Sequence, residues 1–229
     1  MNNVILITSA ICTINKPLDY TESRSYFSHE QRYEQSLQTI ISVRNKISNS
    51  YIIFIEGTKI PEYMEENISK NVDYYFNVSN IEWVYNCVNG LYKGQAEIAS
   101  ILAYFKSPHY DTYNHTFNSI SKISGRYRLC TNFNFDYIED SIILHIVNNN
   151  PHHYSNIWMS TMFYTIPKKL YIDFIKILEE CFNHEETNKG VAIEHILPLC
   201  IVKNNIKTVH KQKLLVEGEY GPWGGYVCH

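Results

Sequence analysis

The stretch Ser119–Leu129, with the sequence SISKISGRYRL, decides the fold that we predict for this chain. Its apolar residues form a short run that ends in glycine and arginine, which predicts a buried strand whose far end opens into a site. Lys122, Arg126 and Arg128 place three cations within this stretch of a chain whose net charge is -3. We expect Gly125, which lacks a Cβ, to let a ligand approach the backbone. The pattern predicts a bound phosphate or diphosphate; the alternative is an edge strand with solvated basic residues and a glycine bulge.

Nearer the N-terminus, the sequence predicts a strand, a helix and a second strand. Residues 4–8 form a continuous apolar run, which is typical of a parallel strand covered on both faces. Ser28 and Gln31 match a capping box, and we expect a helix over residues 29–47. Residues 51–55 form the second buried strand, which completes a βαβ unit with a right-handed crossover.

The loops after these strands hold further candidate site residues. Ligands of α/β sheets bind outside the carboxyl ends of the strands, so we expect Thr8, Ser9 and Ala10 to contact a nucleotide. Arg24 lies within reach of the same site. Glu56 ends the second strand, where it either accepts from a ribose or base or is a solvated loop acid. The chain has no Gly-x-Gly-x-x-Gly and no Walker sequence, which weakens dinucleotide and P-loop interpretations.

Weaker patterns predict the remaining elements. Lys93 and Gly94 precede a helical pattern, and free backbone N–H groups at a helix start can bind an anion; the alternative is an ordinary helix start with a solvated lysine. We also expect helices over residues 60–70 and 167–181 and a loop over residues 108–116. Further strands are expected over residues 72–78, 142–147 and 158–164 and within residues 203–215. The glycine-rich, aromatic tail over residues 217–226 is either a lid or a disordered terminus.

Residues 122–127, Lys-Ile-Ser-Gly-Arg-Tyr, resemble the signature of small GT-A-type glycosyltransferases from large DNA viruses and bacterial surface-polysaccharide loci. The Lys-Gly-x-x-Glu pattern at residues 93–97 resembles the same family. The resemblance implies an α/β, GT-A-like single domain over residues 1–229, with a mostly parallel central sheet flanked by helices. A Rossmann-like nucleotide-sugar-binding half would occupy about residues 1–130. The acceptor half and the C-terminal lid would occupy about residues 131–229.

The implied activity is a hexosyltransferase-like transfer of a sugar from a nucleotide diphosphate sugar, with a UDP-sugar favoured, to a glycan hydroxyl. In this interpretation the donor is bound by the loop after the first strand together with Lys93, Lys122, Ser124, Gly125 and Arg126. Glu194 lies between apolar neighbours at the start of a late helix, the position of an acceptor-facing carboxylate in the family. Apolar surroundings raise a carboxyl pKa, which suits a general base for an inverting displacement. The alternative is a surface helix on which Glu194 pairs with a lysine.

Typical GT-A enzymes hold Mn²⁺ or Mg²⁺ with an Asp-x-Asp motif, and this chain has none. We therefore predict no metal ligands and expect Lys93, Lys122 and Arg126 to neutralise the diphosphate, although Mn²⁺ or Mg²⁺ binding stays open. The missing motif also keeps a rival open, a non-catalytic nucleotide- or sugar-binding protein on the same fold. A nucleotidyltransferase would need clustered acids for its metal, and the sequence shows no convincing cluster.

Composition narrows the partners and the compartment. The slightly acidic charge argues against a general nucleic-acid binder. No apolar run approaches the ~20 residues of a membrane span, and the N-terminus lacks a basic signal-peptide region. The six cysteines form no Cys-x-x-Cys pair and no zinc-like cluster with histidine, so we expect reduced thiols in a cytoplasmic protein.

Overall fold

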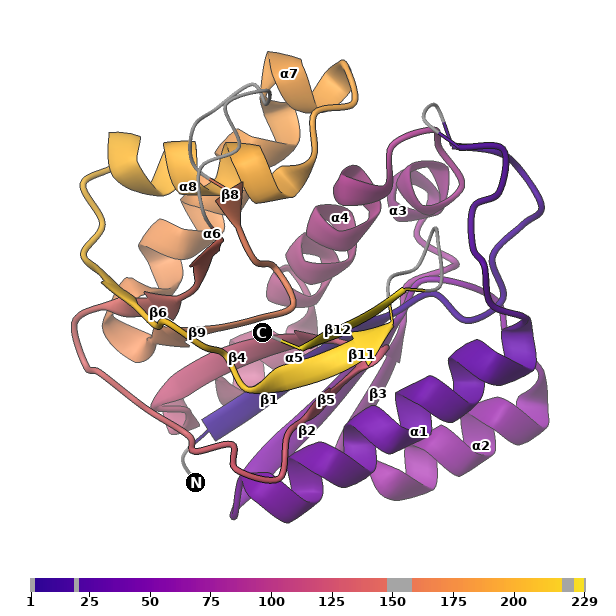
Figure 1. The fold of residues 1–229 in the computed structure, drawn as a ribbon, viewed down its shortest axis with the longest axis horizontal. Coiled ribbons are helices and arrows are strands. Elements are labelled where there is room, and N and C mark those ends of the chain that lie inside the picture. The colour runs from indigo at the N-terminus through magenta and orange to yellow at the C-terminus, as the bar shows by residue number, and fades with distance from the viewer. Residues whose placement is uncertain (1–2, 19–20, 148–157, 220–224, 229) are drawn as a thin grey trace.

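A seven-stranded sheet forms the centre of the computed structural model, which describes residues 3–18, 21–147, 158–219 and 225–228 (Figure 1). The strand order is β10-β6-β9-β4-β1-β2-β3. Strands β4, β1, β2 and β3 are parallel to one another, and β10 is parallel to β6, whereas β9 runs antiparallel to both β4 and β6. The strands are β1 Asn3–Ser9, β2 Ser50–Glu56, β3 Tyr74–Asn77, β4 Ser119–Ser124, β6 Ile142–Leu144, β9 Phe163–Pro167 and β10 Thr208–His210.

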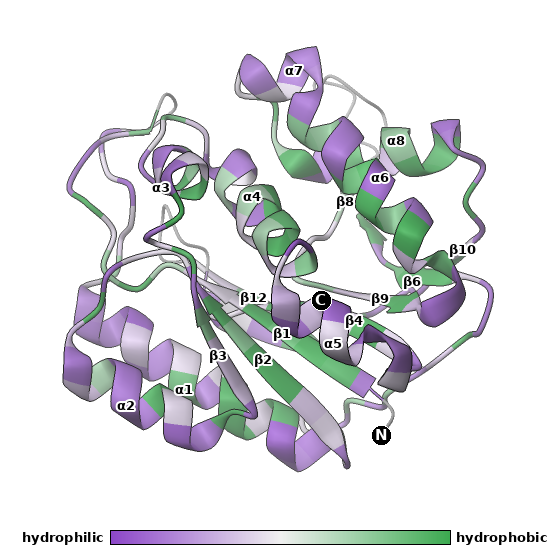
Figure 2. Ribbon diagram, turned by 180° about the vertical axis from the view of Figure 1, so that it is seen from behind, coloured by the Kyte–Doolittle hydropathy of each residue, from purple (hydrophilic) through white to green (hydrophobic). Residues whose placement is uncertain are grey.

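Helices cover both faces of this sheet. The helices α1 and α2 pack on one face, and α3, α4, α5, α6 and α8 pack on the other. Hydrophobic residues are concentrated in the central strands, and hydrophilic residues spread over the outer faces of α1 and α2 (Figure 2). The α/β fold with a mostly parallel, helix-flanked sheet is therefore as predicted. The helices are α1 His29–Lys46, α2 Glu62–Asn71, α3 Glu82–Val88, α4 Lys93–Phe105, α5 Pro108–Tyr113, α6 Tyr171–Asn183, α7 Glu185–Asn188 and α8 Ile193–Lys203, with 3₁₀ turns η1 Asn114–Thr116 and η2 Lys168–Leu170.

The alternation of side chains along β1 explains why this strand lies at the centre. Val4 and Leu6 pack into the core under α4, while Ile5 and Ile7 pack into the core under α1. A strand with both faces covered must be apolar at every position, which accounts for its unbroken run.

The start of α1 is fixed by the predicted capping box. The Ser28 hydroxyl accepts from the Gln31 backbone N–H at 3.2 Å, and the Gln31 side chain accepts from the Ser28 N–H at 2.8 Å. These two bonds satisfy backbone donors that a helix otherwise leaves free. The capping box and the helix start at residue 29 are confirmed.

Three sequence predictions are wrong in their local structure. Residues 108–116 were expected to be a loop, but Pro108 begins the helix α5, because the Ser107 hydroxyl caps it by accepting from the Tyr110 N–H at 3.3 Å. The single strands expected over 142–147 and 158–164 are each divided. The strands β7 (Ile146–Val147) and β8 (Trp158–Met159) pair with each other outside the large sheet, whereas β6 and β9 remain in it.

The C-terminal segment also differs from the predicted mobile tail. The strands β11 (Val216–Glu219) and β12 (Tyr226–Cys228) join β5 (Tyr127–Leu129) in an antiparallel sheet of order β12-β11-β5. Residues 220–224, in the middle of this segment, lie outside the described residues. The lid function expected of residues 217–226 thus stays a prediction. In the described part of the chain, no helix has both the length and the apolar character needed to cross a membrane.

Candidate functional site

A cavity of about 100 Å³ opens at the carboxyl ends of β1 and β4, beside the start of α4. Its lining includes seven of the residues that the sequence nominated, so the structure brings these seven side by side. These are Thr8, Ser9, Ala10, Lys93, Ser124, Gly125 and Arg126; Arg32, Ser36, Val88, Ala96, Glu97 and Ser100 complete the lining.

Gly125 serves the packing of the cavity floor. Its backbone N–H donates to the Thr8 carbonyl at 2.8 Å, and its carbonyl accepts from the Ser36 hydroxyl at 3.1 Å. A Cβ at this position would lie 3.3 Å from Ser36 Oγ, Ser9 Cβ and the Thr8 carbonyl oxygen. The space that we expected a ligand to use on this side is therefore filled by the protein itself.

A second glycine brings the starts of α4 and α8 together. A Cβ on Gly94 would lie 3.1 Å from the backbone nitrogen of Ile193, so a larger residue would push the two helices apart. Lys93 and Glu194, the neighbours of these two residues, thereby come close enough for Glu194 to influence the pKa of Lys93.

Three cations, Arg32, Lys93 and Arg126, line the cavity. In the described part of the chain none of them forms an ion pair with a carboxylate, and Arg32 Nε and Arg126 Nη1 are buried without a hydrogen-bond partner. Burial, and then the charge of Arg126, lower the pKa of Arg32 to about 9. Burial followed by Arg126 and Arg32 lowers the pKa of Lys93 well below its usual value. An anion in the cavity would relieve this repulsion.

Lys122 lies beneath the cavity. Its side chain is 1% exposed, and its Nζ lies 2.7 Å from Glu97 Oε1. The ammonium also donates to the Ser124 hydroxyl and to the Thr161 carbonyl, each at 2.7 Å. Burial lowers its pKa, and Glu97 opposes that shift. Lys122 thus holds the end of β4 against α4, and much of its charge is already balanced by Glu97.

Glu194 belongs to the same network. Its Oε1 accepts from the Thr161 hydroxyl at 3.0 Å, and Thr161 in turn accepts from Lys122 through its carbonyl. Burial, followed by the nearby charge of Glu97, raises the pKa of Glu194. No ion pair to a lysine is formed by Glu194 among the described residues, so the alternative of a surface pair is wrong.

Two other nominated residues contact neighbouring loops and do not line the cavity. Glu56 is fully buried, and its Oε1 accepts from the Ile11 N–H at 3.0 Å, the Thr58 N–H at 2.8 Å and the Thr58 hydroxyl at 2.5 Å. The solvated alternative for Glu56 is therefore wrong, and its ribose contact stays a prediction. Arg24 donates to the carbonyls of Val88, at 2.8 Å, and Gly90. Both residues shape the loops around the site.

Sequence reasoning missed Arg32 and Ser36 and placed Arg128 too close to the site. Arg32 and Ser36 are four residues apart on α1, so they share a helix face. Both side chains are buried, which the pattern of apolar residues along this helix did not indicate. Arg128 is exposed and pairs with Glu217 at 2.6 Å on the three-stranded sheet.

The residues around the cavity do not fit a divalent metal. Of the described residues that line it, Glu97 is the one acid, and the Lys122 ammonium already occupies the position beside it. Hard divalent ions need several oxygen ligands, and three nearby cations would oppose one. The arrangement instead suits an anion with several oxygens, such as a diphosphate.

Comparisons with known proteins support the fold. No protein-family model matches the chain, and no curated protein does. Among solved structures, 208 chains match, and one of them is core-mannan synthase A from Aspergillus fumigatus in a form with manganese and GDP. The two chains superpose with a TM-score of 0.55 and 10% sequence identity, over 96% of this chain and 74% of that one. This likeness shows that the chain has a GT-A-like fold.

Proposed function

We propose that this protein is a glycosyltransferase that moves a sugar from a nucleoside diphosphate sugar to a glycan hydroxyl. The cluster of Arg32, Lys93 and Arg126 is the observation that carries the proposal, because these cations line a cavity at the carboxyl ends of β1 and β4 and none of them forms an ion pair with a carboxylate of the described residues. Ligands of open α/β sheets bind at this edge. The GT-A-like fold and the manganese and GDP of the mannan synthase structure support a nucleotide-sugar donor.

The proposed chemistry is a single displacement. The acceptor hydroxyl gives its proton to the carboxylate of Glu194, and its oxygen forms a bond to the anomeric carbon as the bond to the diphosphate oxygen breaks. The electron pair stays on the diphosphate, where the three cations stabilise the growing negative charge. Attack from the opposite face inverts the anomeric centre. The raised pKa of Glu194 makes it a stronger base for this step.

The donor and the setting follow from the same proposal. We propose a UDP-sugar carrying a hexose as the first donor to test, and GDP-sugars as the second, because the mannan synthase structure holds GDP. Residues 1–130 would bind the donor and residues 131–229 the acceptor. We group the chain with the small viral and bacterial enzymes that its Lys-Ile-Ser-Gly-Arg-Tyr stretch resembles. We further propose that it acts in the cytoplasm, without a nucleic-acid partner or a membrane span.

We propose that the cations neutralise the diphosphate in place of a metal. The manganese of the mannan synthase structure makes a divalent ion the natural alternative. The cavity lining favours the cations, because Glu97, the one acid among the described residues that line it, is already paired with Lys122.

The test is a panel of UDP- and GDP-sugars incubated with the protein, with released nucleoside diphosphate measured by mass spectrometry. We expect one donor to be turned over, and the Glu194→Gln variant to lose turnover while it binds UDP normally. Glu180→Gln is the matched control, because Glu180 pairs with Lys203 at 2.6 Å on the protein surface and should leave turnover unchanged. Nucleotide binding without turnover of any donor would make the protein a binding protein and refute the enzyme proposal.

A further inference from the structure

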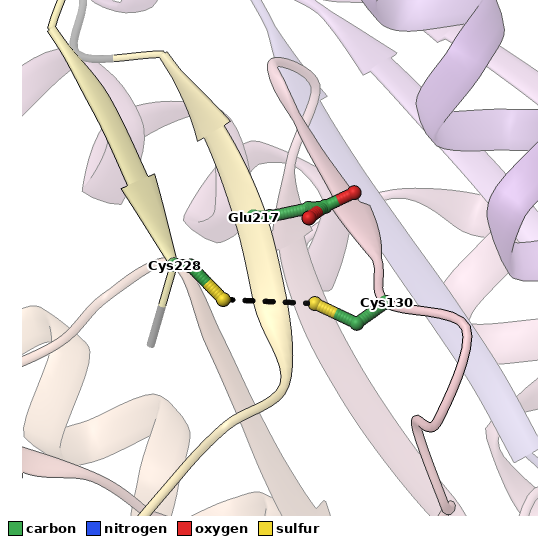
Figure 3. A group of neighbouring side chains, drawn as sticks. All are labelled: Cys130, Glu217 and Cys228. Atoms are coloured by element: carbon green, nitrogen blue, oxygen red, sulfur yellow. Dashed lines mark hydrogen bonds between the residues drawn. The ribbon is translucent and has the colours of Figure 1, made fainter.

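A second group of side chains with ligand chemistry lies on the three-stranded sheet, away from the proposed active site. Cys130 directly follows β5, Glu217 lies on β11, and Cys228 lies on β12 (Figure 3). The sulfur atoms of Cys130 and Cys228 are 4.0 Å apart, and one ligand atom from each of the three residues lies within 4.8 Å of the others. Both cysteines are free thiols in this structure.

The sheet order argues against a disulfide between these cysteines. The strand β11 lies between β12 and β5, so the two backbones are separated by about two strand spacings, roughly 9.6 Å. Disulfides join residues whose Cα atoms are about 4.4–6.8 Å apart. The Cys130 N–H donates to the Leu215 carbonyl at 2.9 Å, which holds Cys130 beside the residue that precedes β11.

A bridging metal ion fits the same geometry. With metal–sulfur bonds of about 2.3 Å and a tetrahedral angle, two thiolates lie about 3.8 Å apart. The observed 4.0 Å between the sulfur atoms is close to this value. Glu217 projects from the strand between the two cysteines and supplies the third ligand atom (Figure 3). Two thiolates with one carboxylate form a donor set that zinc accepts.

The surroundings of Glu217 also suit a metal ligand. Arg128 Nε donates to Glu217 Oε1 at 2.6 Å, and the Tyr226 hydroxyl donates to Oε2 at 2.5 Å. Each carboxylate oxygen has two lone pairs, so one remains free for a metal. Hydrogen bonds of this kind orient ligating carboxylates, and the Arg128 charge would balance the excess negative charge of two thiolates and a carboxylate around a dication.

We propose that Cys130, Glu217 and Cys228 form a zinc site, with the fourth position open to water, that fastens β12 to β11 and β5. Binding of Zn²⁺ forms two zinc–sulfur bonds and one zinc–oxygen bond and releases the two thiol protons. Tyr226 of β12 and Arg126 both line a groove of about 640 Å³ beside the diphosphate cavity. The zinc ion would therefore fix one wall of a groove that reaches the proposed active site.

The test uses the full chain, reduced and freed of metal by a chelator, and titrates it with Zn²⁺ against a chromophoric zinc indicator. We expect one zinc ion for each chain, and a higher melting temperature in zinc. Cys228→Ser should weaken binding by at least about 100-fold and abolish the thermal shift. Cys228 is exposed, so this variant should fold, and Cys87→Ser, a half-buried cysteine on α3, is the matched control that should bind zinc normally.

Cobalt identifies the ligands directly. Co²⁺ added in place of zinc should give thiolate-to-cobalt charge-transfer absorption in the wild type and lose it in Cys130→Ser and Cys228→Ser. The proposal is overturned if the reduced protein binds no zinc, if Cys228→Ser binds it equally well, or if cobalt binds without thiolate absorption. Formation of a Cys130–Cys228 disulfide under mild oxidation by glutathione disulfide, without zinc binding to the reduced protein, would also overturn it.

Discussion

Replacing Arg32 by methionine should stabilise the empty protein and weaken diphosphate binding. The side chain of Arg32 is 6% exposed, and burial together with Arg126 lowers its pKa from 12.5 to about 9. Each pKa unit corresponds to about 1.4 kcal/mol, so keeping Arg32 charged in the folded protein costs at most about 5 kcal/mol of free energy. Relaxation and water in the cavity reduce that penalty. Methionine keeps most of the packing volume and carries no charge.

The net effect on stability follows from two opposing contributions. Arg32→Met loses the hydrogen bond from Nη1 to the Ser25 hydroxyl at 3.0 Å, which contributes about 1 kcal/mol. Removal of the unpaired charge outweighs this loss, and we expect a gain of about 2 kcal/mol, or roughly 4–8 °C in melting temperature. Loss of one charge-assisted hydrogen bond to the diphosphate, about 1.5–3 kcal/mol, should weaken UDP binding roughly 10- to 150-fold.

Thermal unfolding and calorimetric titration with UDP measure both effects on the same samples. Arg44→Met is the matched control, because Arg44 lies on the same helix but is paired with Asp73 at 2.7 Å. This control should lose a little stability and bind UDP normally. If Arg32→Met instead melts at a lower temperature and binds UDP like the wild type, Arg32 is a structural residue and the reasoning about an unpaired cluster is wrong.

Three further predictions concern the site and its loops. Because burial and the neighbouring cations lower the pKa of Lys93, UDP affinity should fall as the pH rises through that pKa, at a lower pH than for an ordinary lysine. Calorimetry across pH should show that Lys93→Arg retains affinity to higher pH, and identical profiles would contradict the assignment. Glu56→Ala should lower the free energy of unfolding by about 3 kcal/mol in urea titrations, because it leaves the buried donors of Ile11 and Thr58 unpaired. Glu56→Gln should lose much less stability, and equal stability of the two variants would refute this role. In the Cys228→Ser variant, which lacks one of the proposed zinc ligands, a chelator such as EDTA should leave the transfer rate unchanged. A loss of rate that Mn²⁺ restores would show that a metal carries the diphosphate charge.

The sequence predicted the elements that strong local signals specify. The unbroken apolar run of β1 and the capping box of α1 act within a few residues, so tertiary context did not alter them. The helix α5 and the division between β8 and β9 depend on a single cap at Ser107 and on pairing with distant strands. Such pairings are not visible in a local pattern.

The same distinction applies to the site. The loop after β1 and the end of β4 could be placed together, because carboxyl ends of parallel strands converge at one edge of a sheet. The position of Arg32 depends on how α1 is rotated against the sheet. The pairing of Lys122 with Glu97 depends on the packing of β4 against α4. The rotation of α1 and the pairing of Lys122 decide which cations at the site lack an ion-pair partner among the described residues. Neither feature could be predicted from the sequence.

A crystal structure with UDP bound tests the central claim most directly. The account predicts that the diphosphate occupies the cavity between β1, β4 and α4, with phosphate oxygens about 2.7–3.2 Å from Arg32, Lys93 and Arg126. A diphosphate bound elsewhere, or one in this cavity that none of the three cations contacts, would contradict it.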